Sequence, residues 1–178
     1  MERVRPAREC EGLAGTLPVL RIEGLGPGVE AGLTLADRNF RYRDRLDDPS
    51  VSGAYAELEA FARTFGGWRR AEQVHGARIL RVDSEGPLPD VAADGMIAAL
   101  GGGVRGAGLL TVTVADCVPV FLSWPEGYGL LHAGWRGTAA GIMEEGLRLS
   151  GADPCSVRMH LGPAIGACCY EVGPEVVR

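Results

Sequence analysis

GLLTVTVADCVPVFLSWPEGYGLLHAGWRGT, residues 108–138, contains three apolar runs that are separated by turn residues. The runs cover residues 108–115, 117–124 and 127–133, and each has the length of a β-strand. Several are apolar at successive positions, so both faces of the strands are expected to be covered. The stretch therefore predicts buried strands of a sheet, and its end leads into a helix expected from Thr138 to Ser150.

The flanking sequence adds further strands and one more helix. After Ser52, apolar residues recur every three to four positions, which predicts a helix that starts at this residue and stops at Gly66-Gly67. Residues 1–17 are polar and are expected to be poorly ordered, and residues 38–49 are expected to form a loop. Residues 101–108 fit a hairpin connection better than a phosphate-binding loop. The remaining short apolar runs predict strands at 18–22, 32–36, 68–74, 78–82, 95–100 and 157–161. The fold class is therefore α/β with mixed sheets.

Composition limits the classes of function. The 178 residues are 46% hydrophobic, which predicts one globular domain over residues 1–178. The net charge is −5 and the sequence has no basic stripe, which argues against nucleic-acid binding. It has no apolar run long enough for a membrane span, no secretory signal, and five cysteines without regular spacing. A reducing cytoplasm is the expected location.

Three side chains stand out as a possible metal site. His75, Cys117 and His132 each lie at the end of an expected strand, next to glycine or proline or one residue away. One cysteine and two histidines are suitable zinc ligands, and three protein ligands leave a fourth position open, as in catalytic zinc sites. Taken singly, His75 and Cys117 are more typical of structural residues and His132 is ambiguous. The spacings of 42 and 15 residues match no compact zinc finger.

Other polar residues have two interpretations each. Arg136 precedes the expected helix at Thr138, where a side chain and free N–H groups could bind phosphate, or it is a solvated charge. Asp94 and Asp116 lie in apolar surroundings and could orient a ligand histidine, transfer protons or cap a turn. Cys168 and Cys169 are adjacent, so a mutual disulfide would be strained, and they either line a pocket or simply pack.

Five motifs together resemble the YfiH/LACC1 family of laccase-domain proteins. They are QVHG (73–76), ADG (93–95), ADCVPV (115–120), HAGWRGT (132–138) and LGPAIGACCYEVG (161–173). The resemblance implies an α/β/β/α layered fold related to a necrotizing-toxin domain. It also implies zinc bound by His75, Cys117 and His132.

The resemblance further implies a purine nucleoside phosphorylase acting on adenosine, inosine and methylthioadenosine, with adenosine deaminase activity. Its partners are then a purine nucleoside and phosphate. Catalytic roles are expected for Cys117, His132 and Asp116. Binding of substrate or phosphate is expected from Arg136, Gln73 and Cys168.

The chain also departs from the family pattern. Family members run past 200 residues and end in a segment with SYRRDG-like residues, so a missing C-terminal segment is expected here. Their N-terminal R-x-GG-x-S element has no match in LTLADRNFRYRDRLDDP.

Three other functions remain open. A cysteine hydrolase would use Cys117 as nucleophile and His132 as base, and could serve in peptidoglycan precursor editing. A copper-dependent polyphenol oxidase would use the same ligands with an axial methionine, such as Met96, Met143 or Met159. A truncated homologue could bind metal without turnover.

Overall fold

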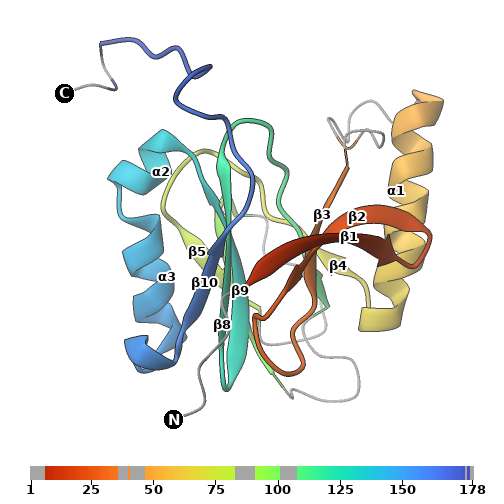
Figure 1. Cartoon of the computed structure of the whole chain (residues 1–178), viewed down its shortest axis with the longest axis horizontal. Helices are drawn as coiled ribbons and strands as arrows, with labels where there is room; N and C mark the ends of the chain where they lie inside the picture. Colours follow the sequence, from red (N-terminus) through yellow and green to blue (C-terminus); the bar gives the residue numbers. More distant parts are fainter. Residues whose placement is uncertain are drawn as a thin grey trace.

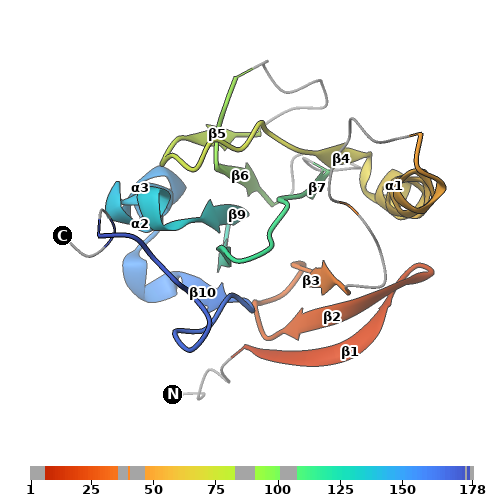
Figure 2. The ribbon, with the colours of Figure 1, turned by 90° about the horizontal axis from the view of Figure 1, so that it is seen from above.

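The structure is a computed structural model that describes residues 7–35, 40, 47–82, 91–100, 108–174 and 176. Its elements form four layers (Figures 1 and 2). Helices α2 (Trp135–Ala139) and α3 (Ile142–Ser150) cover one face of a five-stranded sheet. Two smaller sheets face its other side, and α1 (Pro49–Ala62) lies beyond them. The layered α/β/β/α fold with mixed sheets is thus confirmed.

The central sheet has the strand order β10-β8-β9-β6-β5. Its strands are β5 (Ile79–Arg81), β6 (Gly95–Ala99), β8 (Val118–Trp124), β9 (Gly127–Ala133) and β10 (Arg158–Leu161). Neighbours are antiparallel except for the parallel pair β5 and β6. The sheet therefore consists of one hairpin, β8–β9, and of three strands, β5, β6 and β10, that come from more distant parts of the sequence.

Both faces of the central strands β8 and β9 are buried, as their largely apolar runs predict. Val120 and Leu122 of β8 pack with Ile142 in the cluster under α3, whereas Phe121 packs into the cluster between the sheets. In β9, Leu131 packs in the cluster under α3 and Leu130 packs in the cluster between the sheets. Successive side chains point to opposite faces of a strand, so a strand covered on both sides is apolar at most positions, and its buried polar side chains, here Ser123 and His132, are hydrogen-bonded.

The smaller sheets complete the second β layer. One contains β1 (Arg8–Ala14), β2 (Leu17–Glu23) and β3 (Ala31–Thr34) in that order, and the other pairs β4 (Trp68–Arg69) with β7 (Leu109–Leu110) in parallel. Helix α1 packs here through aromatic contacts, with the rings of Tyr55 and Trp68 6.0 Å apart. Short helical turns, η2 (Arg63–Phe65) and η3 (Pro154–Ser156), lead into β4 and β10.

The expectation that residues 1–17 are poorly ordered is wrong for residues 8–17. Strand β1 pairs with β2 along its whole length, from Arg8 opposite Glu23 to Ala14 opposite Leu17. The Arg8 guanidinium also contacts the Glu23 carboxylate at 2.8 Å. This strand is mostly exposed, so its sequence stays polar and carries little strand signal of its own.

The helix boundaries differ from those expected. Helix α1 begins at Pro49 because the Asp48 carboxylate, rather than Ser52, caps it by accepting the Ser50 N–H at 2.8 Å. Its end near Gly66, which has a left-handed φ of 86°, is confirmed. The helix expected over 138–150 is instead two helices, since Gly141 (φ 81°) interrupts them.

Two expected strands are shorter than predicted. Of the runs 68–74 and 108–115, only β4 and β7 form strands, and the rest has no strand assignment apart from an isolated bridge between Glu72 and Ala92. The hairpin expected at 101–108 is wrong, because the strands on either side of it, β6 and β7, belong to different sheets. Residues 101–107 themselves and most of the loop expected at 38–49 lie outside the described residues. Among the helices that are described, none combines the length and apolar character that crossing a membrane requires.

Candidate metal centre

The three predicted ligands come together at one end of the central sheet. Cys117 immediately precedes β8, and His132 lies near the end of β9. These strands are antiparallel neighbours with Val118 opposite Ala133, so the topology brings the two ligands to the same end. His75 enters from the loop before β5. The ligand atoms of these three residues, called the triad below, all lie within 4.8 Å of one another.

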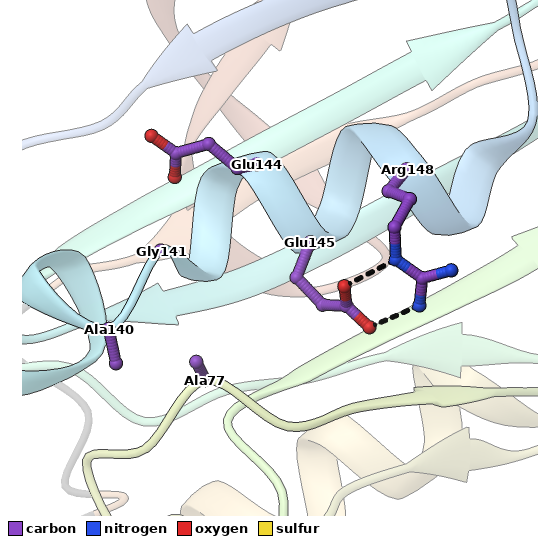
Figure 3. Close-up of a pocket in the computed structure, with 6 residues that line it drawn as sticks. All are labelled: Ala77, Ala140, Gly141, Glu144, Glu145 and Arg148. Carbon is purple, nitrogen blue, oxygen red and sulfur yellow. Dashed lines mark hydrogen bonds and ion pairs between the residues drawn. The ribbon is translucent and has the colours of Figure 1, made fainter.

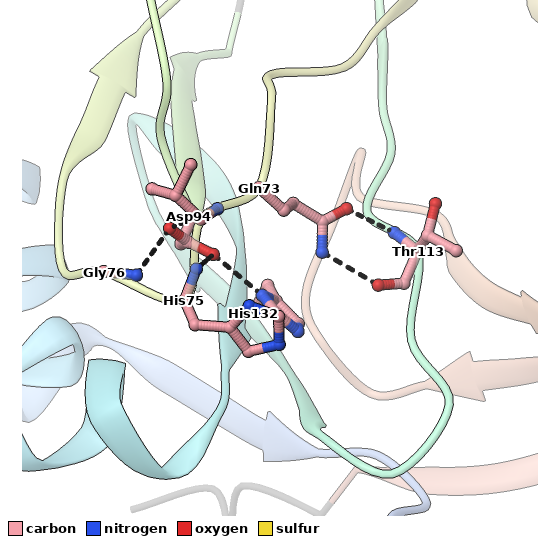
Figure 4. A network of polar contacts seen from close by, with 7 residues as sticks. Gln73, His75, Gly76, Asp94, Thr113 and His132 are labelled. Carbon is pink, nitrogen blue, oxygen red and sulfur yellow. Dashed lines mark hydrogen bonds and ion pairs between the residues drawn. The ribbon is translucent and has the colours of Figure 1, made fainter. Parts of the chain in front are cut away.

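A buried carboxylate orients His132. Asp94, just before β6, is fully buried, and its Oδ1 lies 2.9 Å from Nδ1 of His132 (Figure 4). The main chain brings the two residues together, because the His132 N–H donates to the Asp94 carbonyl. A histidine whose Nδ1 is bonded to a carboxylate has its Nε2 free as the metal ligand.

The same carboxylate fixes the loop that carries His75. It accepts the N–H of His75 at 2.8 Å on Oδ1, and those of Gly76 at 2.7 Å and Val74 at 3.2 Å on Oδ2. His75 has a left-handed φ of 60°, unlike every other described non-glycine residue. Such a conformation costs free energy and persists where surrounding bonds hold it, often at functional sites. Asp94 therefore positions two of the three ligands.

The surroundings of the triad shift the pKa values of Asp94 and Cys117 in opposite directions. Burial alone would raise the pKa of Asp94, but the hydrogen bonds from His132 and from three backbone N–H groups outweigh it and lower this pKa. Burial, followed by the negative charges of Asp116 and Asp94, raises the pKa of the Cys117 thiol. Asp94 is therefore held as a carboxylate, while Cys117 requires a nearby cation to ionise readily.

Two glycines allow the triad to pack closely. A Cβ atom at Gly134 would lie 3.0 Å from Cδ2 of His75 and 3.1 Å from Sγ of Cys117. A Cβ atom at Gly137 would lie 2.6 Å from the Gly76 carbonyl oxygen, so α2 rests directly on the His75 loop. Sequence reasoning did not single out either residue. The signal was the repeated glycine in HAGWRG, directly after a ligand histidine.

The donor set fits a zinc ion. Zinc–nitrogen and zinc–sulfur bonds of about 2.0–2.3 Å place the ligand atoms of one tetrahedral ion about 3.3–3.6 Å apart. The ligand atoms here lie up to 4.8 Å apart, and small side-chain rotations would bring them to zinc-binding distances. The His75 side chain is exposed and therefore has room to rotate. The buried Asp94–His132 pair is the outer support typical of a bound histidine. The residues present thus match a three-ligand site with one open position.

The other predicted site residues have different surroundings. Arg136 is exposed on α2, with its Cζ 4.5 Å from the centre of the Trp135 ring. Asp116 is exposed, and its carbonyl accepts the Ile165 N–H at 3.1 Å. Cys168 is exposed in the turn 167–169. Their catalytic and binding roles stay predictions.

Gln73 has a structural role that its sequence context did not reveal. Its Nε2 donates to the Thr113 carbonyl and its Oε1 accepts the Thr113 N–H, both at 2.8 Å (Figure 4). The amide thereby replaces one ladder pair between the extended segments that follow β4 and β7. A substrate contact by Gln73 stays a prediction, and it would compete with these bonds.

A separate shallow cavity lies beside α3 (Figure 3). Its volume is about 390 Å³. Glu145 and Arg148 form a two-point ion pair on its wall, with contacts of 2.6 and 2.7 Å. The lining residues are Ala77, Ala140, Gly141, Glu144, Glu145 and Arg148, none of which was predicted as a site residue.

Comparison with known sequences identifies the family. Residues 33–178 match the sequence model of the family described as multi-copper polyphenol oxidoreductase laccase. The chain belongs to this family. Curated relatives of this laccase-family chain include purine nucleoside phosphorylase YlmD of Geobacillus stearothermophilus, 36% identical over 87% of the chain and 58% of the relative. Purine nucleoside phosphorylase YfiH of Escherichia coli is 38% identical over 59% of the chain and 42% of its own length.

Solved structures agree with this membership. The crystal structure of YlmD from Geobacillus stearothermophilus matches with a TM-score of 0.65 at 27% identity, over 99% of the chain and 69% of its own. Hypothetical protein YfiH of Bacillus licheniformis matches with a TM-score of 0.61 at 27% identity, over 90% of the chain and 63% of its own. The resemblance predicted from the five motifs is confirmed. The laccase-family chain spans about half the length of the first curated relatives it matches.

Proposed function

We propose that the protein is a zinc-dependent purine nucleoside phosphorylase that acts on adenosine, inosine and methylthioadenosine. The observation that carries the proposal is the triad of His75, Cys117 and His132, with its ligand atoms within 4.8 Å and His132 oriented by Asp94. The names of the relatives, purine nucleoside phosphorylase, support the reaction class. Adenosine deaminase activity is proposed as a second reaction of the same site.

The triad would hold zinc, which when bound supplies a Lewis acid that polarises an oxygen or nitrogen of the substrate. Its neutral histidines and thiolate leave the centre positively charged, which suits an anionic co-substrate such as phosphate. The exposed side of His75 is the side from which substrate would approach. Asp94 keeps His132 in one tautomer throughout.

In phosphorolysis an oxygen of phosphate forms a bond to C1′ of the ribose, and the bond from C1′ to the purine nitrogen breaks. The leaving purine takes up a proton. Arg136, exposed on α2, is proposed to bind the phosphate, since guanidinium groups pair well with its oxygens. Asp116, whose charge is close enough to raise the pKa of Cys117, is proposed to supply or accept the proton.

Gln73 and Cys168 are proposed to contact the substrate. In deamination, water adds to C6 of adenosine and ammonia leaves, and Asp116 is the proposed proton carrier by analogy with zinc deaminases. Both reactions require the substrate to approach the triad from the exposed side of His75, because α2 is packed against the other side of this loop.

The decisive experiment combines metal analysis with a phosphate-dependence assay. Purified chain is expected to contain one zinc ion and to release free base from adenosine or inosine only when phosphate is present. Cys117→Ala is expected to lose both the zinc and the activity. Native-rate turnover by that variant, or by protein freed of metal, would overturn the proposal.

A cysteine hydrolase is the second proposal, because Cys117 and His132 belong to the same cluster. The raised pKa of Cys117 counts against it, since a protonated thiol is a poor nucleophile. The hydrolase proposal predicts that, in metal-free protein, labelling of Cys117 by iodoacetamide proceeds in parallel with loss of activity. Loss of activity on chelation supports the phosphorylase instead.

Copper is the alternative metal, in keeping with the family description. Of the methionines that could serve as a weak axial ligand, Met96 is buried in the core between the sheets and Met143 packs against the cluster under α3. Intense blue absorbance on adding copper, with turnover of phenols, would favour copper over zinc. We further propose a cytoplasmic location, which the five free cysteines support.

A further inference from the structure

Cys168 and Cys169 form a pair of exposed thiols that the proposed reaction leaves largely unexplained. Their Sγ atoms lie 2.9 Å apart, and both residues are exposed. The turn that carries them is held by two backbone bonds, in which the N–H groups of Cys169 and Tyr170 donate to the Gly166 carbonyl at 3.0 and 3.1 Å. The two sulfurs are therefore presented together to solvent by an ordered turn.

Backbone geometry disfavours a disulfide between these two residues. Consecutive Cα atoms across a trans peptide are about 3.8 Å apart, whereas the Cα atoms of disulfides usually lie about 4.4–6.8 Å apart. The hydrogen bond from Cys168 also raises the pKa of the Cys169 thiol, which slows its oxidation. The pair therefore tends to stay reduced, with two soft donors available to one ligand.

We propose that Cys168 and Cys169 form a two-thiol binding site for a soft, thiophilic metal or metalloid centre, separate from the triad. Soft thiolate ligands select such centres over hard cations. With a trivalent arsenical, two S–H bonds break, two S–As bonds form, and the arsenic-bound oxygen leaves as water with both protons. Arsenic stays trivalent, so the step needs no oxidant or reductant.

The chain connects this site with the triad without merging the two. After β10, Gly162 donates its N–H to the Pro119 carbonyl at 2.9 Å, and Ile165 donates to the Asp116 carbonyl at 3.1 Å. The turn is thus attached to the segment that carries Cys117. A probe could therefore also bridge Cys117 and Cys168, and the experiment must distinguish the two cases.

Phenylarsine oxide is the probe, because its arsenic forms a stable ring only with two neighbouring thiols. The reduced 178-residue chain is expected to bind one phenylarsenic group, as measured by mass spectrometry, and to lose two thiols that react with Ellman's reagent. The adduct should survive glutathione, a monothiol, and be released by dithiothreitol. Cys168→Ser and Cys169→Ser should each weaken binding at least tenfold.

Cys155→Ser and Cys117→Ser are the controls, since Cys155 is another exposed cysteine and Cys117 belongs to the triad. Both variants should bind the probe as the parent chain does. Retained binding in Cys168→Ser or Cys169→Ser, or loss in Cys117→Ser, would overturn the two-thiol site. Because the readout is thiol count and mass, the outcome is independent of phosphorylase activity.

Discussion

The Asp94 carboxylate lies 2.9 Å from Nδ1 of the His132 imidazole, and both side chains are buried. Through the N–H groups of residues 74–76, the same carboxylate also holds the loop of His75. One acidic side chain thus connects two ligands that are 57 positions apart in the sequence (His75 and His132). The geometry of the candidate metal centre therefore depends on this residue as well as on the three ligands.

Asp94→Asn should weaken zinc binding by about 10–100-fold, the usual effect of losing an outer-shell partner. Both Asp94 oxygens accept hydrogen bonds from backbone N–H groups, so the NH₂ group of an asparagine would face at least one of these donors. Competition with a chromophoric chelator measures the affinity. Asp153→Asn, which changes a carboxylate that accepts the Cys155 N–H in an exposed turn, should bind zinc like the parent. Equal affinities in the two variants would contradict the role of Asp94.

Gly134→Ala should disturb the triad directly. The new Cβ would lie 3.0–3.1 Å from side-chain atoms of His75 and Cys117, so one of them must move. We expect weaker zinc binding and a loss of stability of about 1–3 kcal/mol, as for overpacked cores. Chelator competition and urea unfolding test both effects, and unchanged zinc affinity would count against the close packing.

Gly53→Ala is the matched glycine substitution away from the metal. Gly53 is exposed within α1, and a Cβ there has no atom within 4 Å. Alanine should therefore stabilise the protein by roughly 0.5–1 kcal/mol, because glycine is unfavourable inside helices. Urea unfolding should show a higher midpoint with unchanged zinc content. A lower midpoint would contradict the open environment.

Gln73→Ala should lower the free energy of unfolding by about 1–3 kcal/mol, since Thr113 loses partners for its N–H and carbonyl. The measurement is urea unfolding combined with steady-state kinetics. If Gln73 acts only between the two segments, KM for adenosine should not change in the folded variant. A raised KM would show that it also contacts substrate, as the sequence resemblance implies.

Arg136→Ala should reduce kcat/KM for phosphate by about 10–150-fold, corresponding to one charged hydrogen bond of about 1.5–3 kcal/mol. Steady-state assays at varied phosphate test this, and Arg136→Lys should recover part of the loss. Arg148→Ala, in which the exposed partner of Glu145 is removed, is the control and should keep the parent kinetics. Equal effects of the two alanine variants would remove Arg136 from the phosphate site.

Much of the fold follows from the local sequence. The runs that form β8, β9 and β6 are apolar at most successive positions, and successive side chains point to opposite faces, so burial of both faces could be predicted. The exposed strand β1 could not, because its polar sequence lacks a strand pattern and its place is set by pairing with β2. The break at Gly141 was missed because a single glycine does not by itself end a helical pattern.

The sequence by itself determined the ligand types of the metal centre and the motifs that assign the family. Only the tertiary structure decided that Asp94, rather than Asp116, orients His132, and that Gln73 bonds to Thr113. The ligand chemistry is a property of single side chains, so the sequence alone reveals it. Which carboxylate reaches which imidazole depends on strand order and register, here on β6 lying beside β9, and distant backbone pairing sets these.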